Sequence, residues 1–286
     1  MIYLNGDWTA LADARVSVLD RGFLFADGVY DVVPVYSRHP FRLDEHLGRL
    51  QASLDSIRLA NPLPASQWRA LVLQAVAQQD FEDQQVYVQV TRGCGPNRDF
   101  PFPDPVQPST LIYPMPLITA SAELKAQGVS AISREDYRWL RCDIKSLALL
   151  ANVLLRNEAL AQGCAESILL RDGWLTEGAA SNIFVVKGGV LCCPPKSQLM
   201  LSGITYDVVL ELAAAHRVPL EVRPVSAQEL RAADEIWMTS STREILPITR
   251  LDGVAVGSGH PGPLAAQMDA WSQAFKHNVL RQGGAS

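Results

Sequence analysis

One lysine of this chain stands where its amine is positioned to act as a nucleophile. Only five of the 25 basic residues are lysines, and Lys145, in CDIKSLALLANVLL, follows a predicted strand and precedes a strongly apolar predicted helix over 146–163. Partial burial there disfavours the ammonium form and leaves a nucleophilic amine, the group that forms a Schiff base with an aldehyde. The alternative is a lysine at a helix start whose amine reaches solvent.

A carboxylate that is a second candidate site residue lies in LLRDGWLTEGAASNIFVV. Glu177 follows a predicted strand and precedes Gly178, Ala179, Ala180 and Ser181, which are small enough to let a ligand or backbone approach. A carboxylate in that place can face the ring nitrogen of a bound pyridine. A solvated residue of a hairpin is the alternative.

Two segments carry groups that bind anions. The string SGIT at 202–205 opens a predicted helix over 204–217, and the free N–H groups of a helix start attract phosphate. An ordinary N-cap by Ser202 explains the string equally well. The run TSSTRE at 239–244 adds hydroxyls at a strand end, as a phosphate cup or as a turn.

An arginine is available for the same anion. In DEHLGRL, His46 and Arg49 are three residues apart and share one face of a predicted helix. An exposed ion pair of Arg49 with Asp44 or Glu45 is the alternative. A lysine, an acid, an arginine and two anion sites together match what pyridoxal 5′-phosphate (PLP) requires of a protein.

The elements that must position these side chains are mixed strands and helices. We expect two α/β domains: a small N-terminal domain at 1–117, a linker at 118–123 within a connection over 117–128, and a larger cofactor-binding domain at 124–286. Asp172-Gly173 and Gly188-Gly189 mark hairpin turns. Further predicted strands are at 1–8, 15–20, 29–36, 84–93, 109–117, 129–139, 221–226 and 235–241, and further helices at 44–59, 68–79 and 265–280.

Composition excludes several classes of protein. Hydrophobic residues make up 48% and charged residues 19%, which is typical of a compact chain, and a net charge of −5 gives no basic field for nucleic acid. The longest apolar stretch, near 146–155, is too short to cross a membrane. The start has no leader pattern, the five cysteines form no C-x-x-C, and the histidines show no zinc spacing. We therefore expect a cytoplasmic protein without a metal.

The chain resembles the class IV, or fold-type IV, aminotransferases, and within them most closely the D-amino acid aminotransferase group. The resemblance covers essentially the whole chain, through DRGFLFADGVYDVVPVY, FRLDEHLGRL, VQVTRG, RCDIKSLALLANVL, LLRDGWLTEGAASNIFVV, LSGIT and MTSSTREILPI in the family's order. It implies the α+β fold-type IV architecture with PLP in the cleft between two α/β domains. It also implies a homodimer that moves an amino group from a D-amino acid to a 2-oxo acid.

The resemblance assigns roles to particular residues. Lys145 would form the internal aldimine with PLP, Glu177 would pair with the pyridine nitrogen, and Tyr30 would contact the substrate. The groups implied to hold the phosphate are the side chain of Arg49, the backbone of Ile204 and Thr205, and the hydroxyls of Ser240 and Ser241.

One stretch departs from the family pattern. D-amino acid aminotransferases usually follow TRG with Pro-Arg-x-His-x-Phe-Pro, whose arginine and histidine bind the substrate carboxylate from the neighbouring subunit, whereas this chain reads TRGCGPNRDFPFP. With Asn97 as an insertion, Arg98 takes the place of the arginine and Phe100 that of the histidine. Alternatively, Arg98 pairs with Asp99 or Asp104, and Arg138 or Arg243 binds the carboxylate.

Three other functions are compatible with the same motifs. Branched-chain amino acid aminotransferase and 4-amino-4-deoxychorismate lyase share the fold and most of these residues. The TEGAASN string and the Arg98 region favour the D-amino acid group. A catalytically silent PLP-binding or carrier protein is disfavoured by the presence of both Lys145 and Glu177.

Overall fold

The computed structural model describes residues 1–277 and divides the chain into two compact units. The first unit comprises Met1–Leu117 together with Ile144–Leu149, and the second comprises Ile118–Asp143 and the chain from Leu150 onward. This division differs from the expected contiguous one, because the short segment that carries Lys145 packs with the first unit.

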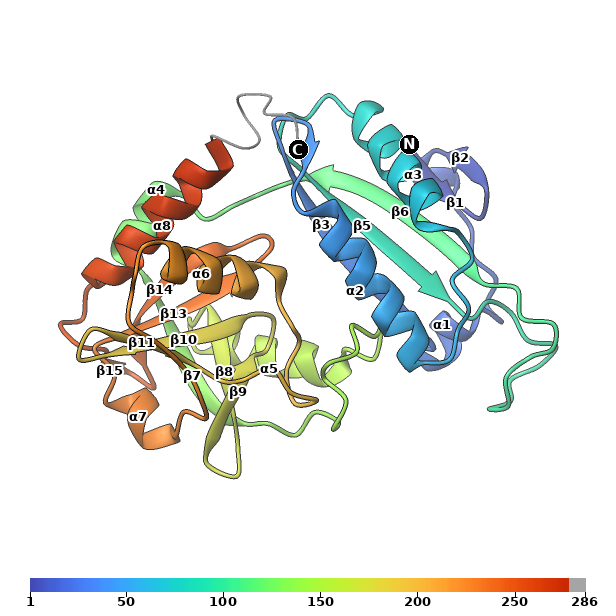
Figure 1. The fold of residues 1–286 in the computed structure, drawn as a ribbon. Helices are drawn as coiled ribbons and strands as arrows, with labels where there is room; N and C mark the ends of the chain where they lie inside the picture. Colours follow the sequence, from blue (N-terminus) through green and yellow to red (C-terminus); the bar gives the residue numbers. More distant parts are fainter. Residues whose placement is uncertain (278–286) are drawn as a thin grey trace. The chain divides into compact units, whose positions relative to one another are not determined.

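The first unit is built on a six-stranded antiparallel sheet in the order β2-β1-β6-β5-β3-β4. Its central pairs, β3 with β5 and β5 with β6, are the longest (Figure 1). The strands are β1 (Ile2–Leu4), β2 (Asp7–Thr9), β3 (Gly28–Tyr36), β4 (His39–Pro40), β5 (Gln84–Thr91) and β6 (Ser109–Pro116).

Helices α2 (Leu43–Ser56) and α3 (Ala65–Ala77) cover one face of this sheet (Figure 1). The helical spacing of Leu47, Leu50 and Leu54 predicts α2, and all three are buried in one core with strand residues such as Val33 and Val86. A 3₁₀ turn at Leu11–Asp13 and a short helix, α1 (Arg21–Phe25), precede β3.

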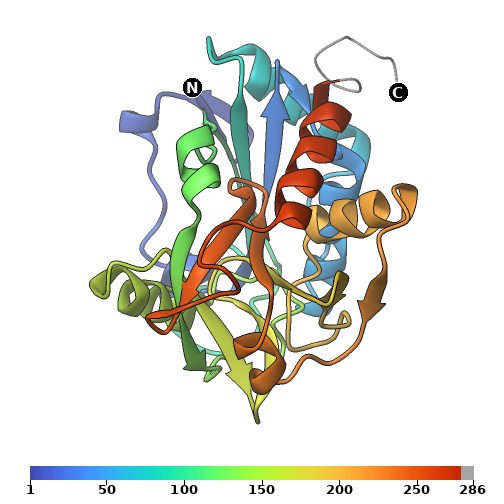
Figure 2. The ribbon, with the colours of Figure 1, turned by 90° about the vertical axis from the view of Figure 1, so that its left-hand side faces the viewer.

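The second unit is built on a nine-stranded mixed sheet in the order β12-β11-β10-β13-β14-β7-β8-β9, with β15 beside β14. Helices α6 and α8 pack against each other and against β13 and β14 (Figures 1 and 2). The strands are β7 (Val129–Glu135), β8 (Glu166–Arg171), β9 (Trp174–Gly178), β10 (Asn182–Lys187), β11 (Val190–Cys193), β12 (Leu220–Val222), β13 (Glu235–Ser240), β14 (Glu244–Leu251) and β15 (Val254–Ala255). The helices are α4 (Ala122–Gln127), α5 (Leu150–Ala161), α6 (Ile204–Ala215), α7 (Ala227–Arg231) and α8 (Pro263–Lys276).

The two hairpin turns read from the sequence are confirmed. Asp172 and Gly173 have φ of 51° and 79°, and Gly188 and Gly189 have φ of 57° and 78°. Two successive positive φ angles are the requirement of a type I′ turn, whose twist matches that of the flanking strands. These turns place β8 against β9 and β10 against β11.

Three local predictions are wrong. Residues 15–20 form no strand, since Val16 and Val18 are 57% and 69% exposed and only Asp20 makes a single bridge, to Cys94. The connection at 117–128 contains α4, which Ser121 caps by accepting a hydrogen bond from the N–H of Leu124. The helix expected from 146 begins only at Leu150.

Strand β14 and helix α8 also differ from the predicted elements. Strand β14, which begins at Glu244, the last residue of TSSTRE, is absent from the predicted strands. The terminal helix expected over 265–280 is observed as α8 up to Lys276, and residues 278–280 lie outside the described residues. Within residues 1–277 no helix is both long enough and apolar enough to cross a bilayer.

Candidate active site

Lys145 lies in an extended segment that hydrogen-bonds to β3. Ser146 bridges to Val29, the carbonyl of Lys145 accepts a hydrogen bond of 2.9 Å from the N–H of Tyr30, and its own N–H donates to Ser53 Oγ at 3.2 Å. These bonds use backbone groups that a helix would need, which explains why the helix starts later. The main chain of Lys145 is thereby fixed on both sides.

The amine of Lys145 lies over an aromatic face. Its Nζ is 4.4 Å from the ring centroid of Tyr30, and the ring of Tyr30 stacks on Tyr87 at 5.5 Å between centroids. The lysine is half-buried rather than extended into water. The structure therefore brings two of the expected site residues, Lys145 and Tyr30, into direct contact.

Arg49 is held by a buried aspartate that sequence reasoning did not single out. Its Nε and Nη2 each lie 2.8 Å from an oxygen of Asp31, and His46 Nδ1 lies 2.7 Å from the same carboxylate. Burial alone would raise the pKa of Asp31, but Arg49 and His46 outweigh it and hold that pKa well below its usual range. Asp31 therefore presents Arg49 as a fixed guanidinium.

The expected alternative partners of Arg49 are engaged elsewhere. Asp44 pairs with Arg69, and Glu45 lies 3.4 Å from Arg42. Burial lowers the pKa of His46, and the charge of Asp31 opposes that shift. Nδ1 of His46 faces the Asp31 carboxylate, while the buried Nε2 has no partner within the described residues.

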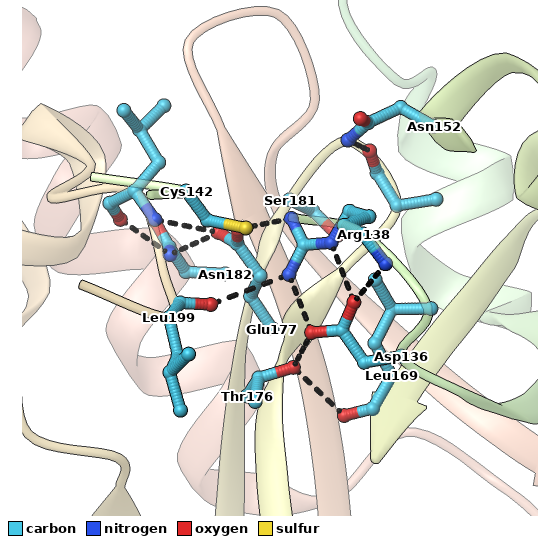
Figure 3. Close-up of polar contacts among 12 residues, drawn as sticks. Asp136, Arg138, Cys142, Asn152, Leu169, Thr176, Glu177, Ser181, Asn182 and Leu199 are labelled. Atoms are coloured by element: carbon cyan, nitrogen blue, oxygen red, sulfur yellow. Dashed lines mark hydrogen bonds and ion pairs between the residues drawn. The ribbon is translucent and has the colours of Figure 1, made fainter. Parts of the chain in front are cut away.

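Glu177 is buried in β9 and is not a solvated hairpin residue. Only 5% of it is exposed, and its Oε1 lies 2.5 Å from Arg138 Nη1. Its Oε2 accepts a hydrogen bond from the N–H of Leu201 at 3.1 Å. It also accepts one from Asn182 Nδ2 at 3.3 Å (Figure 3). Burial raises the pKa of the Glu177 carboxyl to about 7, and the charge of Arg138 acts in the opposite sense.

Arg138 is itself locked in place from its other side. Asp136 accepts from Nε and Nη2 of Arg138, both at 2.9 Å, and from Thr176 Oγ1 at 2.9 Å (Figure 3). Arg171 approaches Asp136 to 3.2 Å. Burial lowers the pKa of Arg138, but Asp136 and Glu177 outweigh it, so the guanidinium stays charged. Arg138 is thus a partner of both Glu177 and Asp136.

The start of α6 provides uncapped backbone N–H groups. Its N-cap is Gly203, and no side chain caps it, so the alternative of an N-cap by Ser202 is wrong. The N–H groups of Ile204 and Thr205 in the first turn have no intrahelical acceptor. A Cβ on Gly203 would overlap the side-chain oxygen of Asn182, so any other residue would have to displace that side chain.

Asn182 links this helix start to Glu177. Its Nδ2 donates both to Glu177 and to the carbonyl of Leu201, the latter at 3.0 Å. In the sheet register Asn182 also lies opposite Thr239. Glu177, the start of α6 and the end of β13 are therefore neighbours within the second unit.

Ser240 is the last residue of β13, Ser241 begins the turn between β13 and β14, and both are half-buried. The N–H of Arg243 donates to Ser240 Oγ at 3.0 Å, which leaves the hydroxyl proton of Ser240 to be donated elsewhere. The run TSSTRE therefore contains a turn, and it also supplies hydroxyl groups that can donate hydrogen bonds.

Arg98 lies in an exposed loop. Its guanidinium is 5.2 Å from the ring centroid of Phe25, which is also 5.4 Å from the ring of Phe100. Arg21 fixes this loop by donating to the carbonyls of Asp99, Phe100 and Pro101. Within the described residues the alternative ion pairs of Arg98 with Asp99 or Asp104 do not form.

Residues 1–277 also contain no group of three His, Cys, Asp or Glu side chains that is arranged to hold a metal ion.

Known proteins resemble this chain in sequence and in fold. The family model described as Amino-transferase class IV matches residues 28–251. A D-alanine aminotransferase of Listeria innocua is 40% identical over 280 residues, covering 95% of this chain and 93% of that protein. A D-alanine aminotransferase of Bacillus licheniformis is 37% identical over 281 residues, covering 98% of each.

Solved structures give the same result for the fold. The branched-chain amino acid aminotransferase of Escherichia coli superposes with a TM-score of 0.88 at 27% identity, covering 96% of this chain and 92% of that one. A fold IV transaminase of Curtobacterium pusillum gives 0.80 at 29% identity, covering 92% and 91%. These two α+β units therefore have the fold-type IV architecture, which confirms the expected fold class.

The chain belongs to the class IV aminotransferases. It is accordingly an enzyme that transfers amino groups, as the ordered set of sequence motifs predicted.

Proposed function

We propose that this enzyme uses PLP to move an amino group from a D-amino acid to a 2-oxo acid. The observation that carries the proposal is the amine of Lys145, held 4.4 Å from the ring centroid of Tyr30 on a main chain that is fixed on both sides. The names of the D-alanine aminotransferases to which the chain is 37–40% identical support the choice of substrate.

The donor set fits PLP. The uncapped N–H groups after Gly203 and the free hydroxyl proton of Ser240 suit a phosphate, and the buried carboxylate of Glu177 suits a protonated pyridine nitrogen. We assign the phosphate to Arg49, the backbone of Ile204 and Thr205, and the hydroxyls of Ser240 and Ser241. When bound, PLP withdraws electrons from the α-carbon of the substrate.

The protein's own groups handle the protons. Lys145, as a neutral amine, takes the proton from the substrate α-carbon and later returns it. Glu177, as a carboxylate, holds a proton on the ring nitrogen, and the charge of Arg138 opposes the rise of the Glu177 pKa that burial causes. Tyr30 contacts the substrate, and its ring face packs against the amine of Lys145.

A panel of D- and L-amino acids with 2-oxoglutarate tests the function. We expect D-alanine alone to convert the absorbance of the bound cofactor and to release at most one pyruvate per active site. Continued formation of pyruvate should require an amino acceptor. Faster conversion of L-leucine than of D-alanine would identify a branched-chain enzyme instead. Acceptor-independent release of pyruvate from aminodeoxychorismate would identify a lyase, and no spectral change with any donor would identify a silent PLP-binding protein.

Arg98 is proposed to bind the substrate carboxylate. Charge-assisted hydrogen bonds contribute roughly 1.5–3 kcal/mol each, so Arg98→Ala should lower kcat/KM for D-alanine by about 10²-fold or more. Phe100→His adds a donor and should lower the KM for D-alanine. Steady-state kinetics of both variants decide the matter, and unchanged kinetics of Arg98→Ala would show that another arginine, such as Arg243, binds the carboxylate.

The homodimer is also a proposal. In the first unit Val16, Val18, Phe23 and Phe100 are 57%, 69%, 74% and 74% exposed, which is costly for apolar side chains in water. A second copy of the chain is proposed to cover them. Light scattering after size exclusion should give twice the chain mass of 31.3 kDa. A fully active monomer at all concentrations would contradict the proposal.

A further inference from the structure

Glu244 occupies an unfavourable backbone conformation at the start of β14, directly after the turn that joins it to Ser240 at the end of β13. Its φ is 58°, in the left-handed region that favours glycine or asparagine, and it ends the three-residue connection between β13 and β14. Such positions persist when the surrounding structure holds them, and they cluster at functional sites. What holds Glu244 is therefore informative.

Glu244 is buried, with 6% of the residue exposed. Its carboxylate is surrounded by cations from two helices. Lys276 of α8 pairs with Oε1, Lys125 of α4 donates to Oε2 at 2.9 Å, and Gln273 of α8 donates to Oε2 at 2.9 Å. Burial would raise the pKa of Glu244, but the two lysines outweigh it and lower that pKa to about 2. The carboxylate is thus ionised and tied to both helices.

The same residue is directly coupled to the turn. In the β13–β14 register Glu244 lies opposite Ser240, and only residues 241–243 separate the two. Arg243, the neighbour of Glu244, donates its N–H to Ser240 Oγ. A displacement of Glu244 must therefore move the hydroxyl of Ser240.

We propose that Glu244 is a positioning residue for the phosphate of PLP, and that Lys125 and Lys276 anchor it to α4 and α8. The proposal rests on the proposed function, because it takes Ser240 and Ser241 as donors to that phosphate. The two lysines do not touch the cofactor in this scheme. They fix the backbone of the turn so that its hydroxyls and N–H groups stay directed at one point.

A comparison of two ligands tests this role. The apoenzyme is titrated with PLP and with pyridoxal, which lacks the phosphate, in the wild type, Glu244→Gln and Lys276→Met. Loss of one well-placed hydrogen bond to a charged group predicts that the Kd for PLP rises about tenfold or more, while the Kd for pyridoxal stays within about twofold. Lys276→Met leaves Glu244 paired with Lys125 and Gln273, so it decides the question if Glu244→Gln does not fold.

Lys187→Met is the matched control. Lys187 makes an exposed ion pair of 3.0 Å with Asp234 in the same unit, so its loss should change neither Kd. Equal losses for PLP and pyridoxal, or no loss for either ligand, in Lys276→Met would overturn the role of Glu244 in positioning. If the wild type binds no PLP at all, the proposed function fails first, and the two failures are distinguishable.

Discussion

Replacement of Glu177 by glutamine will slow amino transfer from D-alanine by about 10²–10³-fold while the protein still binds PLP. Glutamine keeps the size of the side chain but removes the charge that holds a proton on the ring nitrogen. Losing one preorganised electrostatic contact of this kind typically costs that much in rate. Stopped-flow measurement of the first half-reaction is the appropriate assay, and a near-wild-type rate would show that Glu177 does not pair with the nitrogen.

The pH dependence of the same half-reaction tests the partner of Glu177. Burial raises the pKa of Glu177 to about 7, and the charge of Arg138 opposes that rise. Arg138→Met removes the opposing charge, so the carboxylate ionises only at still higher pH and the rising limb of the pH–rate profile moves upward. Arg138→Lys, which retains a charge, should move the rising limb less far than Arg138→Met does. An unchanged profile in Arg138→Met would contradict the pairing.

Replacement of Lys145 by alanine will reduce turnover by about 10⁴-fold or more, the largest effect expected of any single substitution. The amine serves as the general base at the substrate α-carbon, a role that alone typically contributes 10²–10⁴-fold, and it also serves as the covalent anchor of the cofactor. Lys187→Ala, at an exposed ion pair, is the control and should leave turnover unchanged. Retention of more than about a tenth of the activity in Lys145→Ala would exclude this lysine as the base.

Local sequence patterns predicted most of the elements because burial and turn chemistry agree with them. The spacing of Leu47, Leu50 and Leu54 indicates a helix, and burial of one face requires the same helix. Asp172-Gly173 and Gly188-Gly189 likewise favour the positive φ angles that their hairpins use. Where local preference and tertiary packing favour the same structure, local sequence patterns are enough to predict the element.

The failures are places where a tertiary partner decides the local structure. The segment around Lys145 has the composition of a helix, but its hydrogen bonds to Tyr30 and Ser53 hold it extended. Val16 and Val18 have high β-propensity, yet within residues 1–277 they pair with no strand. Tyr30 and Ser53 lie too far from Lys145 in the sequence for a local pattern to reveal these contacts.

The same reason limits what the sequence says about the site. Asp31 contacts Arg49 from another element, 18 residues away in the sequence, and the residues around it do not reveal this contact. Asp136 and Asn182 lie only two and five residues from Arg138 and Glu177, but their burial depends on the packing of the second unit. Alternation offered one signal, because in β3 the residues on either side of Asp31 point to the opposite face of the sheet. The ordered family motifs, rather than spacing, were what indicated Lys145, Glu177 and Arg49.

The central claim, that Lys145 carries the cofactor, is tested most directly by borohydride reduction of the purified protein followed by peptide mapping. The account predicts a yellow protein whose visible absorbance is lost on reduction, with the phosphopyridoxyl label on the peptide that contains Lys145 and on no other. Wild type and Lys145→Ala are mapped side by side, and the variant should carry no label. A label on Lys125, Lys187, Lys196 or Lys276, or a wild-type protein without any label, would contradict the account.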